Sequence, residues 1–381
     1  MRTNHLAILL ILISISLIGC MLSQSPSVEP SAQASLEPTA NEQPVSTNPA
    51  PSPVPTSEVG IVEPTVPPTE LPTEEPTALP EPLTPEVFPI TVDQAGFGPS
   101  SITADWENLW VGGASRDLAV KVRPSDGQVL QVVELSKFGV GVTDMAFDGA
   151  NVWALVADSA IKVRASDGEV LGSYPLVVDE AGFVPANLAL DAGMVWVGAS
   201  NRDLALKLHT STGQIAYVVE LGKFGVGVTD MALYGEHMWI LVGDSVLKVD
   251  YYENQIVGSY NLSFDDAGLV PQSVTAGGES IWVGGRGRDV VVKVRPDDGQ
   301  VLQVVEVAKL SAGVRDLAYD GENVWALVSS FVVKFRASDG EILGSYDVGP
   351  GAARLRYDGT YIWVTNPESG VLIRFQPNWS K

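Results

Sequence analysis

A tryptophan inside a short hydrophobic run recurs seven times along the 381-residue chain. The copies are Trp110, Trp153, Trp196, Trp239, Trp282, Trp325 and Trp363. The first six are 43 residues apart and the last follows after 38, and a fixed period of this length indicates a repeat architecture. Each unit also contains four short β-rich runs separated by turn signals. Strands this short at this spacing predict the four-stranded blade of a β-propeller.

The repeated units alternate between two types. From the tryptophan to the basic residue of the third strand the step is eleven residues in the odd units (type A) and nine in the even units (type B), as in Trp110 to Lys121 and Trp153 to Lys162. A two-blade unit therefore occurs three times and is followed by one more type A blade. The sequence predicts an all-β, seven-bladed β-propeller over residues 87–378.

The two ends of the repeat region are predicted to meet. The segment from Phe88 aligns with the segment from Tyr174 at an offset of 86 residues, and the last unit supplies only three strands before Gln376. A strand beginning near Val87 is therefore expected to fill the outermost place of the last blade. Such closure removes the open sheet edges that a ring must avoid.

The N-terminal region is predicted to contain a secretory signal, a lipidation site and a linker. Residues 1–19 have the charge and length of a secretory signal, and the end of this run, Leu17-Ile18-Gly19-Cys20, resembles the bacterial lipobox, which implies lipidation of Cys20. An uncleaved anchor with an incidental cysteine is the alternative. Residues 20–86 are rich in Pro, Thr, Ser and Glu and are predicted to be a disordered linker. We expect a propeller held outside the cytoplasm, at the cell surface or on the periplasmic side.

Composition excludes several classes of function. The net charge of −23 disfavours nucleic acid, which basic residues recognise by neutralising phosphates. A single cysteine excludes an internal disulfide. The sequence contains no nucleophile elbow, phosphate loop or dinucleotide fingerprint. We therefore expect no cofactor, no bound metal and a monomer.

The phrase Phe147-Asp148-Gly149-Ala150-Asn151-Val152-Trp153 resembles the YVTN, NHL and virginiamycin-B-lyase-like repeats of bacterial propeller lipoproteins. The resemblance covers residues 87 to about 376 and implies a propeller. Its lyase branch also implies a catalytic histidine and a metal. This chain departs from that pattern, because His209 and His237 stand where sister repeats carry arginine or asparagine. Both are expected to be ordinary surface residues.

Two faces of the ring are predicted to differ in character. The turns between first and second strands and between third and fourth strands share one face, the turn face, where Asp-Gly pairs such as Asp148-Gly149 are expected to form turns rather than calcium loops. Loops between second and third strands share the opposite face, the connection face, with the connections between blades. Candidate site residues belong to this second face or to the adjoining channel.

The candidate ligand-binding residues come from repeated and unrepeated positions. The long type A loops carry Arg116, Arg202 and Arg288, each followed by an aspartate, and the first strands of the type B blades carry Asp144, Asp230 and Asp316 beside the central channel. Departures from the repeat add Arg286, Arg315 and Glu368, which together with Arg288 are the predicted contacts of an asymmetrically bound ligand.

These residues admit three interpretations. In the first, each arginine pairs with a nearby aspartate and an aromatic residue plugs the gap between blades, which is a structural staple. In the second, a polar bowl at the channel mouth holds a carboxylate, a sulfate or sugar hydroxyls. In the third, the three aspartates hold a metal, although alternate blades are expected to place them too far apart for one ion.

Two hypotheses of function remain. The leading one is a membrane-tethered binding or scaffold module for an extracellular protein or glycan, without catalytic residues. The alternative is a lyase or hydrolase acting on an extracellular glycoconjugate or small molecule. An enzyme should show a carboxyl with a raised pKa inside a concave pocket, whereas a display module should not.

Overall fold

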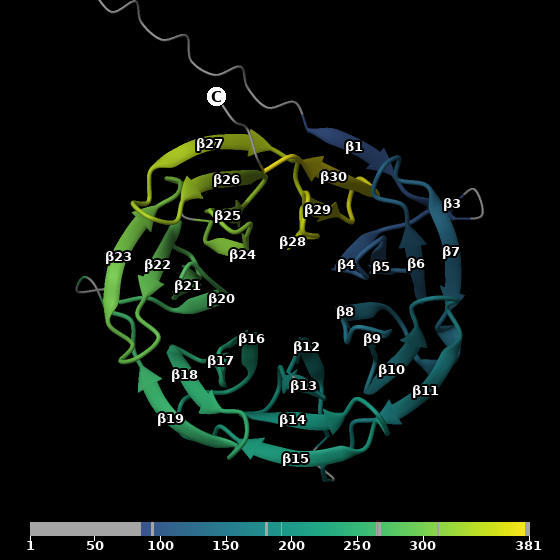
Figure 1. Cartoon of the computed structure of the whole chain (residues 1–381), viewed down its shortest axis with the longest axis horizontal. Coiled ribbons are helices and arrows are strands. Elements are labelled where there is room, and N and C mark those ends of the chain that lie inside the picture. Colours follow the sequence, from purple (N-terminus) through teal and green to yellow (C-terminus); the bar gives the residue numbers. More distant parts are fainter. Residues whose placement is uncertain are drawn as a thin grey trace, which may run out of the picture. The chain divides into compact units, whose positions relative to one another are not determined.

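The computed structural model describes residues 85–377 except 93–94, 180–181, 192, 264, 266–267 and 311. The predicted signal, Cys20 and the predicted linker up to residue 84 lie outside the described residues. In this part of the chain seven four-stranded antiparallel sheets form a ring around a central channel (Figure 1). The predicted seven-bladed β-propeller is confirmed.

The first three type A blades take their strands in chain order, from the channel outward. Their strands are β4 (Pro99–Ala104), β5 (Leu109–Gly113), β6 (Leu118–Val122) and β7 (Val129–Glu134) in blade 1; β12 (Pro185–Leu190), β13 (Met194–Ala199), β14 (Leu204–His209) and β15 (Ile215–Glu220) in blade 3; and β20 (Pro271–Gly277), β21 (Ser280–Gly285), β22 (Val290–Val294) and β23 (Val301–Glu306) in blade 5.

The type B blades follow the same order. Their strands are β8 (Val142–Phe147), β9 (Asn151–Val156), β10 (Ser159–Arg164) and β11 (Val170–Pro175) in blade 2; β16 (Val228–Tyr234), β17 (His237–Val242), β18 (Ser245–Asp250) and β19 (Gln255–Tyr260) in blade 4; and β24 (Val314–Tyr319), β25 (Asn323–Val328), β26 (Phe331–Arg336) and β27 (Ile342–Asp347) in blade 6.

Blade 7 is built from both ends of the propeller. It contains β28 (Arg354–Tyr357), β29 (Ile362–Asn366) and β30 (Val371–Phe375), and the early strand β1 (Glu86–Pro89) pairs with β30 as its outermost strand. The predicted closure is confirmed. A two-stranded hairpin, β2 (Thr91–Val92) and β3 (Ala95–Gly96), and a single 3₁₀ turn, η1 (Ser136–Phe138), complete the described elements. No helix among the described residues is long and apolar enough to cross a membrane.

The alternation of eleven and nine residues is a difference in loop length. In both blade types the tryptophan of the second strand lies directly opposite the basic residue of the third strand, as in Trp110 with Lys121 and Trp153 with Lys162. The additional residues of type A lengthen the loop between those strands on the connection face. The repeated pair is therefore one structural unit at all seven positions.

Each tryptophan connects three parts of its surroundings. All seven indoles are fully buried, in hydrophobic clusters that lie between neighbouring blades. In five blades the indole N–H donates to the aspartate that opens the first turn, as Trp153 does to Asp148 at 2.8 Å. The same carboxylate accepts the backbone N–H of Asn151 at 2.7 Å. The predicted turn chemistry of these aspartates is thus confirmed.

The basic residue of the third strand clasps each blade to the next. Its charged end lies near the tryptophan ring and donates to a backbone carbonyl of the following blade; Lys121, for example, reaches the carbonyl of Ala165 at 2.8 Å. In blade 7 the residue is Arg374, which donates to the carbonyl of Pro124 in blade 1 and to Glu86 of β1. The last clasp therefore closes the ring without a disulfide among the described residues.

Candidate functional site

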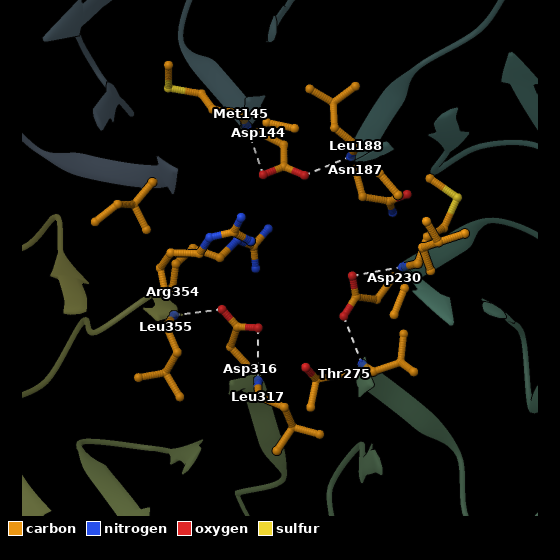
Figure 2. Close-up of a pocket in the computed structure, with 18 of the residues that line it drawn as sticks. Asp144, Met145, Asn187, Leu188, Asp230, Thr275, Asp316, Leu317, Arg354 and Leu355 are labelled. Carbon is orange, nitrogen blue, oxygen red and sulfur yellow. Dashed lines mark hydrogen bonds between the residues drawn. The ribbon is translucent and has the colours of Figure 1, made fainter. Parts of the chain in front are cut away.

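The central channel contains a cavity with a volume of about 480 Å³. Its wall is formed by the first strands of the blades, and the lining includes three aspartates, Asp144, Asp230 and Asp316, and three arginines, Arg315, Arg354 and Arg356. The aspartates were predicted to lie beside the channel, and the structure places them there. Figure 2 shows their carboxylates arranged around the channel, with Arg354 reaching toward its centre.

One position of the first strand supplies several of the polar residues that line the channel. In blade order this position holds Ser101, Asp144, Asn187, Asp230, Ser273, Asp316 and Arg354. In blades 1 to 6 the pairing register between first and second strands shifts at or beside this residue. Such a bulge bends the strand and redirects a side chain. Blade 7 pairs Arg354 with Thr365 in continuous register.

The three aspartates hold neighbouring blades together. Each carboxylate accepts the backbone N–H of the next residue and one backbone N–H from the first strand of the following blade. Asp144 accepts from Met145 at 2.9 Å and from Leu188 at 2.7 Å. Asp230 and Asp316 repeat the pattern with Val274 and Leu355. These side chains therefore have a structural task, whatever else they do.

The two arginines of β28 differ from the aspartates in their bonding. Among the residues that the structure describes, neither the Arg354 nor the Arg356 guanidinium donates a hydrogen bond to a protein acceptor. Arg354 is half-buried and Arg356 is exposed to the channel. A guanidinium carries five N–H donors, so the channel offers donors that its own carboxylates do not take up.

The enclosure of the ring changes the ionisation of these groups. Burial raises the pKa of Asp230 to about 7, and the nearby charge of Asp316 adds to the shift. Burial also raises the pKa of Asp144 and of Asp316, while Arg354 opposes the rise at both. Burial acts to lower the pKa of Arg354, but attraction to Asp316, Asp144 and Asp230 outweighs it and raises the pKa. The channel is a coupled set of opposite charges.

The arginines of the long type A loops bond to the preceding connection instead of lining the channel. Arg202 donates to Asp179 at 2.7 Å and Arg288 to Asp265 at 2.6 Å. Arg116 donates to the carbonyl of Val92 at 2.9 Å. Each guanidinium thus ties its loop to the connection that enters the same blade.

The aspartates of the same loops bond to the connection that leaves the blade. Asp117 accepts the backbone N–H of Gly141 at 2.7 Å, and Asp289 accepts those of Ala312 and Gly313 at 2.8 Å. Phe97 and Phe183 of the entering connections are buried in the clusters between blades. This bonding and packing are what the structural-staple interpretation predicts.

The unrepeated candidates are dispersed over the connection face. Arg315 lines the channel and donates to the carbonyl of Ala352 at 2.6 Å. Arg286 donates to Gln272, another channel residue, at 2.7 Å. Glu368 is exposed in the loop after β29, beside Gly351. Of the four predicted contacts of an asymmetric ligand, Arg315 lines the channel and Arg286 lies beside it; Arg288 pairs with Asp265.

Metal ligation and histidine chemistry gain no support from the geometry. No group of three potential ligands among the described residues is placed to hold a metal ion. His209 is exposed at the end of β14, and His237 is half-buried at the start of β17. Burial lowers the pKa of His237.

Arg354 and Arg356 were not predicted as site residues. Their signal is present in the sequence, because Arg354 stands where the other type A blades have Ser101, Asn187 and Ser273. The shorter step of 38 residues into the last unit hides this alignment. The seventh blade therefore departs from the repeat on its first strand as well as in the loop that carries Glu368.

A scan against models of known protein families and a search of curated proteins returned no match to this chain. The resemblance to YVTN, NHL and virginiamycin-B-lyase-like repeats therefore stays a prediction. Among solved structures the chain is similar to the computationally designed Ika8 protein, with a TM-score of 0.56 and 12% identity over 75% of this chain and 98% of that one. At this identity the likeness concerns the fold alone.

Proposed function

We propose that this protein is a lipid-tethered, extracytoplasmic binding module whose channel receives an acidic group of a protein or glycan. The observation that carries the proposal is the pair of guanidiniums of Arg354 and Arg356, which face the channel without a hydrogen-bonded acceptor among the described residues. Arginine donors bind carboxylates and sulfates through paired, charge-assisted hydrogen bonds. An acidic group in the channel would supply the missing acceptors.

The size and charge of the channel agree with such a ligand. A cavity of about 480 Å³ lies within the range of small-molecule sites, so a side chain or a single sugar residue fits better than a folded partner. Arg315 adds a third positive charge to the wall. The net charge of −23 repels anions at long range, but salt screens that repulsion beyond about 8 Å.

Ionisation of Asp230 is expected to control the affinity. When all three aspartates are charged they balance Arg315, Arg354 and Arg356. Because the pKa of Asp230 is raised to about 7, protonation below that pH leaves the channel with a net positive charge. Affinity for an acidic ligand should therefore increase as the pH falls from 8 to 6.

The test compares binding of acidic and neutral probes by the full chain in detergent. Uronic-acid and sulfated oligosaccharides, acidic peptides and their uncharged counterparts are presented on one array. Arg354→Gln with Arg356→Gln should weaken acidic binding about tenfold or more. The matched control is Arg295→Gln, a half-buried arginine of the turn face whose guanidinium pairs with Asp298 at 3.0 Å. Acidic binding that survives in the folded double variant contradicts the proposal.

A second variant separates binding from folding. Arg354→Lys keeps the positive charge among the three aspartates but loses the planar pair of donors. Its melting temperature should lie within a few degrees of that of the wild type, whereas its affinity for the acidic probes should be lower. A variant that melts normally and binds normally contradicts a role for the guanidinium.

The tether is a separate part of the proposal and rests on Leu17-Ile18-Gly19-Cys20. Growth of the producing cells with a labelled fatty acid should label the wild type and leave Cys20→Ser unlabelled and released from the membrane fraction. Equal membrane retention of both proteins, without label, supports an uncleaved anchor instead.

One observation favours the enzyme alternative. Asp230 is a carboxyl with a raised pKa inside a concave site, which is the feature expected of an acid–base catalyst. Both of its oxygens accept backbone N–H groups, however, so the carboxylate is fixed in orientation by the two blades that it connects. Turnover of a captured ligand that is lost in Asp230→Asn, with binding retained, would establish catalysis.

A further inference from the structure

A second cavity, of about 310 Å³, lies on the turn face where blade 7 meets blade 1. Its lining includes Trp106, Glu107, Arg123, Ser125, Thr360 and Tyr361. The residues come from the first turn of each of the two blades and from the third turn of blade 1. None of them lines the central channel, so this cavity is independent of the proposed acidic-group site.

Trp106 is in a conformation that its side chain disfavours. Its φ is 75°, in the left-handed region, where a bulky residue is a steric outlier. Blades 2 and 6 have glycine at this place, Gly149 with φ 98° and Gly321 with φ 103°. Backbone strain of this kind persists where the surroundings impose it and is concentrated at functional sites.

Trp106 is also exposed to an unusual degree. It is 82% exposed, whereas the seven repeated tryptophans are fully buried. Its one ring contact is with Phe147, at 5.9 Å between ring centroids and an interplanar angle of 78°. Because this contact is edge-to-face and the residue is largely exposed, most of the indole surface remains open to solvent. Trp106 therefore presents a large, flat apolar surface to solvent, and its backbone is held in a disfavoured conformation.

Tyr361 supplies a second ring from the opposite side of the junction. It stands where blades 1, 2 and 6 have Asn108, Asn151 and Asn323, so it also departs from the repeat. The Arg374 guanidinium lies 4.4 Å from its centroid, and the buried Trp363 packs edge-on against it. This clasp fixes the orientation of the tyrosine, whereas Trp106 is held mainly through its backbone.

Polar groups complete the lining. Glu107 is exposed beside Trp106, and Arg123 is placed by hydrogen bonds to Asp126 and Gln128. The hydroxyls of Ser125 and Thr360 add neutral donors and acceptors. A purely apolar ligand would leave these groups facing it unpaired, which is costly. A neutral sugar offers both an apolar C–H face and a rim of hydroxyls.

We infer that this junction is a binding site for a neutral carbohydrate. One sugar ring stacks its C–H face on Trp106, because an indole presents a broad apolar surface at low conformational cost. Hydroxyls of the same ring or of its neighbour bond to Glu107, Arg123 and Thr360. The open shape of the site fits the end or edge of a longer chain, so affinity should grow with the number of sugar residues.

The experiment titrates the full chain in detergent with neutral hexasaccharides of glucose, mannose and N-acetylglucosamine. Binding is followed by isothermal titration calorimetry for every variant, and in the wild type also by protection of the exposed Trp106 from iodide quenching. At least one series should bind saturably and protect the wild type. Trp106→Gly, which restores the residue found in sister blades, should weaken that binding about tenfold or more while remaining folded.

Two control variants make the result specific. Tyr252→Ala removes another exposed aromatic residue from a turn of blade 4 and should bind like the wild type. Arg354→Gln with Arg356→Gln, in the channel, should also leave neutral-sugar binding unchanged. No saturable binding of any neutral hexasaccharide by the folded wild type, or equal binding by folded Trp106→Gly, overturns the inference. Loss of acidic binding alone in the channel variant would support the channel proposal without supporting this one.

Discussion

The middle of each blade and its inner edge differ in how strictly their residues follow the repeat. In the middle, the tryptophan, its cross-strand basic residue and the clasp to the next blade occur seven times. At the inner edge, the aspartate staple occurs three times, and blade 7 replaces the small polar residue with Arg354. Positions that build the ring are repeated, whereas the positions we propose for binding depart from the repeat.

Both proposed sites depend on the same blade. Blade 7 contributes Arg354 and Arg356 to the channel and Thr360 and Tyr361 to the turn-face cavity. It also contains the closing strand β1, which connects to the predicted linker. Blade 7 takes its fourth strand from the other end of the propeller, so it departs from the repeat. Both proposed sites include residues of this blade. The predictions below separate the repeated positions from the unrepeated ones.

The largest effect is expected at a repeated tryptophan. Trp153→Ala should lower the free energy of unfolding by about 3–5 kcal/mol, because it opens a cavity between blades 2 and 3 and leaves Asp148 without its indole donor. Urea denaturation followed by circular dichroism measures the loss. Trp106→Ala is the control and should change stability by less than about 1 kcal/mol. Similar losses at the two positions would contradict the distinction.

The clasp that closes the ring should matter more than the same clasp elsewhere. Arg374→Met should cost about 2–3 kcal/mol, since the guanidinium lies over three aromatic rings and bonds to Pro124 and Glu86. Lys248→Met, in the middle of the chain, removes one clasp to Pro296 and should cost less. Denaturant midpoints of the two variants test the order. A larger loss at Lys248 would show that closure carries no additional stability.

Much of the fold could be predicted because the repeat itself encodes it. The spacing of tryptophan and basic residue predicted blade number and blade type, since each copy must satisfy the same cross-strand contact. Closure was predicted from the alignment of the segment from Phe88 with the segment from Tyr174 and from the missing fourth strand of the last unit. The sequence left the contacts of the long loops open between the structural-staple and the polar-bowl interpretations. Whether Arg202 turns toward the channel or toward Asp179 depends on the path of a connection more than twenty residues earlier, which a repeat pattern does not specify.

The candidate site was predicted only in part. Asp144, Asp230 and Asp316 are visible because they recur, but Arg354 and Arg356 occur in one blade behind a change in spacing. Their importance comes from convergence across the channel, which brings groups from four blades together. Trp106 lies outside the 43-residue period, so the repeat predicts neither its exposure nor its positive φ.

The inner edge should respond to pH with a defined sign. The pKa of Asp230 is raised to about 7, so its contribution to stability is fully present below its unfolded pKa and is lost as pH rises through about 7. Between about pH 4 and pH 7 stability should fall by at most about 1.4 kcal/mol per pH unit from this one proton, and it should level off above pH 7. Asp230→Asn should flatten that slope.

Two other sets of groups define the conditions of this measurement. His237, whose pKa is lowered by burial, acts in the opposite sense in the same window, so the comparison is best made in a His237→Asn background, the residue found in sister blades. Turn aspartates with lowered pKa values, such as Asp148, lose their contribution only below about pH 4. A slope that persists in Asp230→Asn would assign it to Asp144 and Asp316, whose pKa values are raised in the same direction.

The smallest effect concerns Trp106, and its sign is the informative part. Trp106→Gly should raise the free energy of unfolding by about 0.5–1 kcal/mol, because glycine adopts a φ of 75° without steric cost and the lost indole is 82% exposed. Two effects oppose the gain: the edge contact with Phe147 is lost, and glycine makes the unfolded chain more flexible.

Thermal and urea unfolding of Trp106→Gly and Trp106→Ala separate the relief of strain from the loss of the indole, since alanine in the left-handed region retains most of the strain. If Trp106→Gly stabilises the protein and Trp106→Ala does not, then Trp106 lowers the stability of the fold. A residue retained at a cost in stability is expected at a binding site. If glycine destabilises the protein, Trp106 contributes to the packing of blades 1 and 2, and the case for a carbohydrate site then rests on the binding data alone.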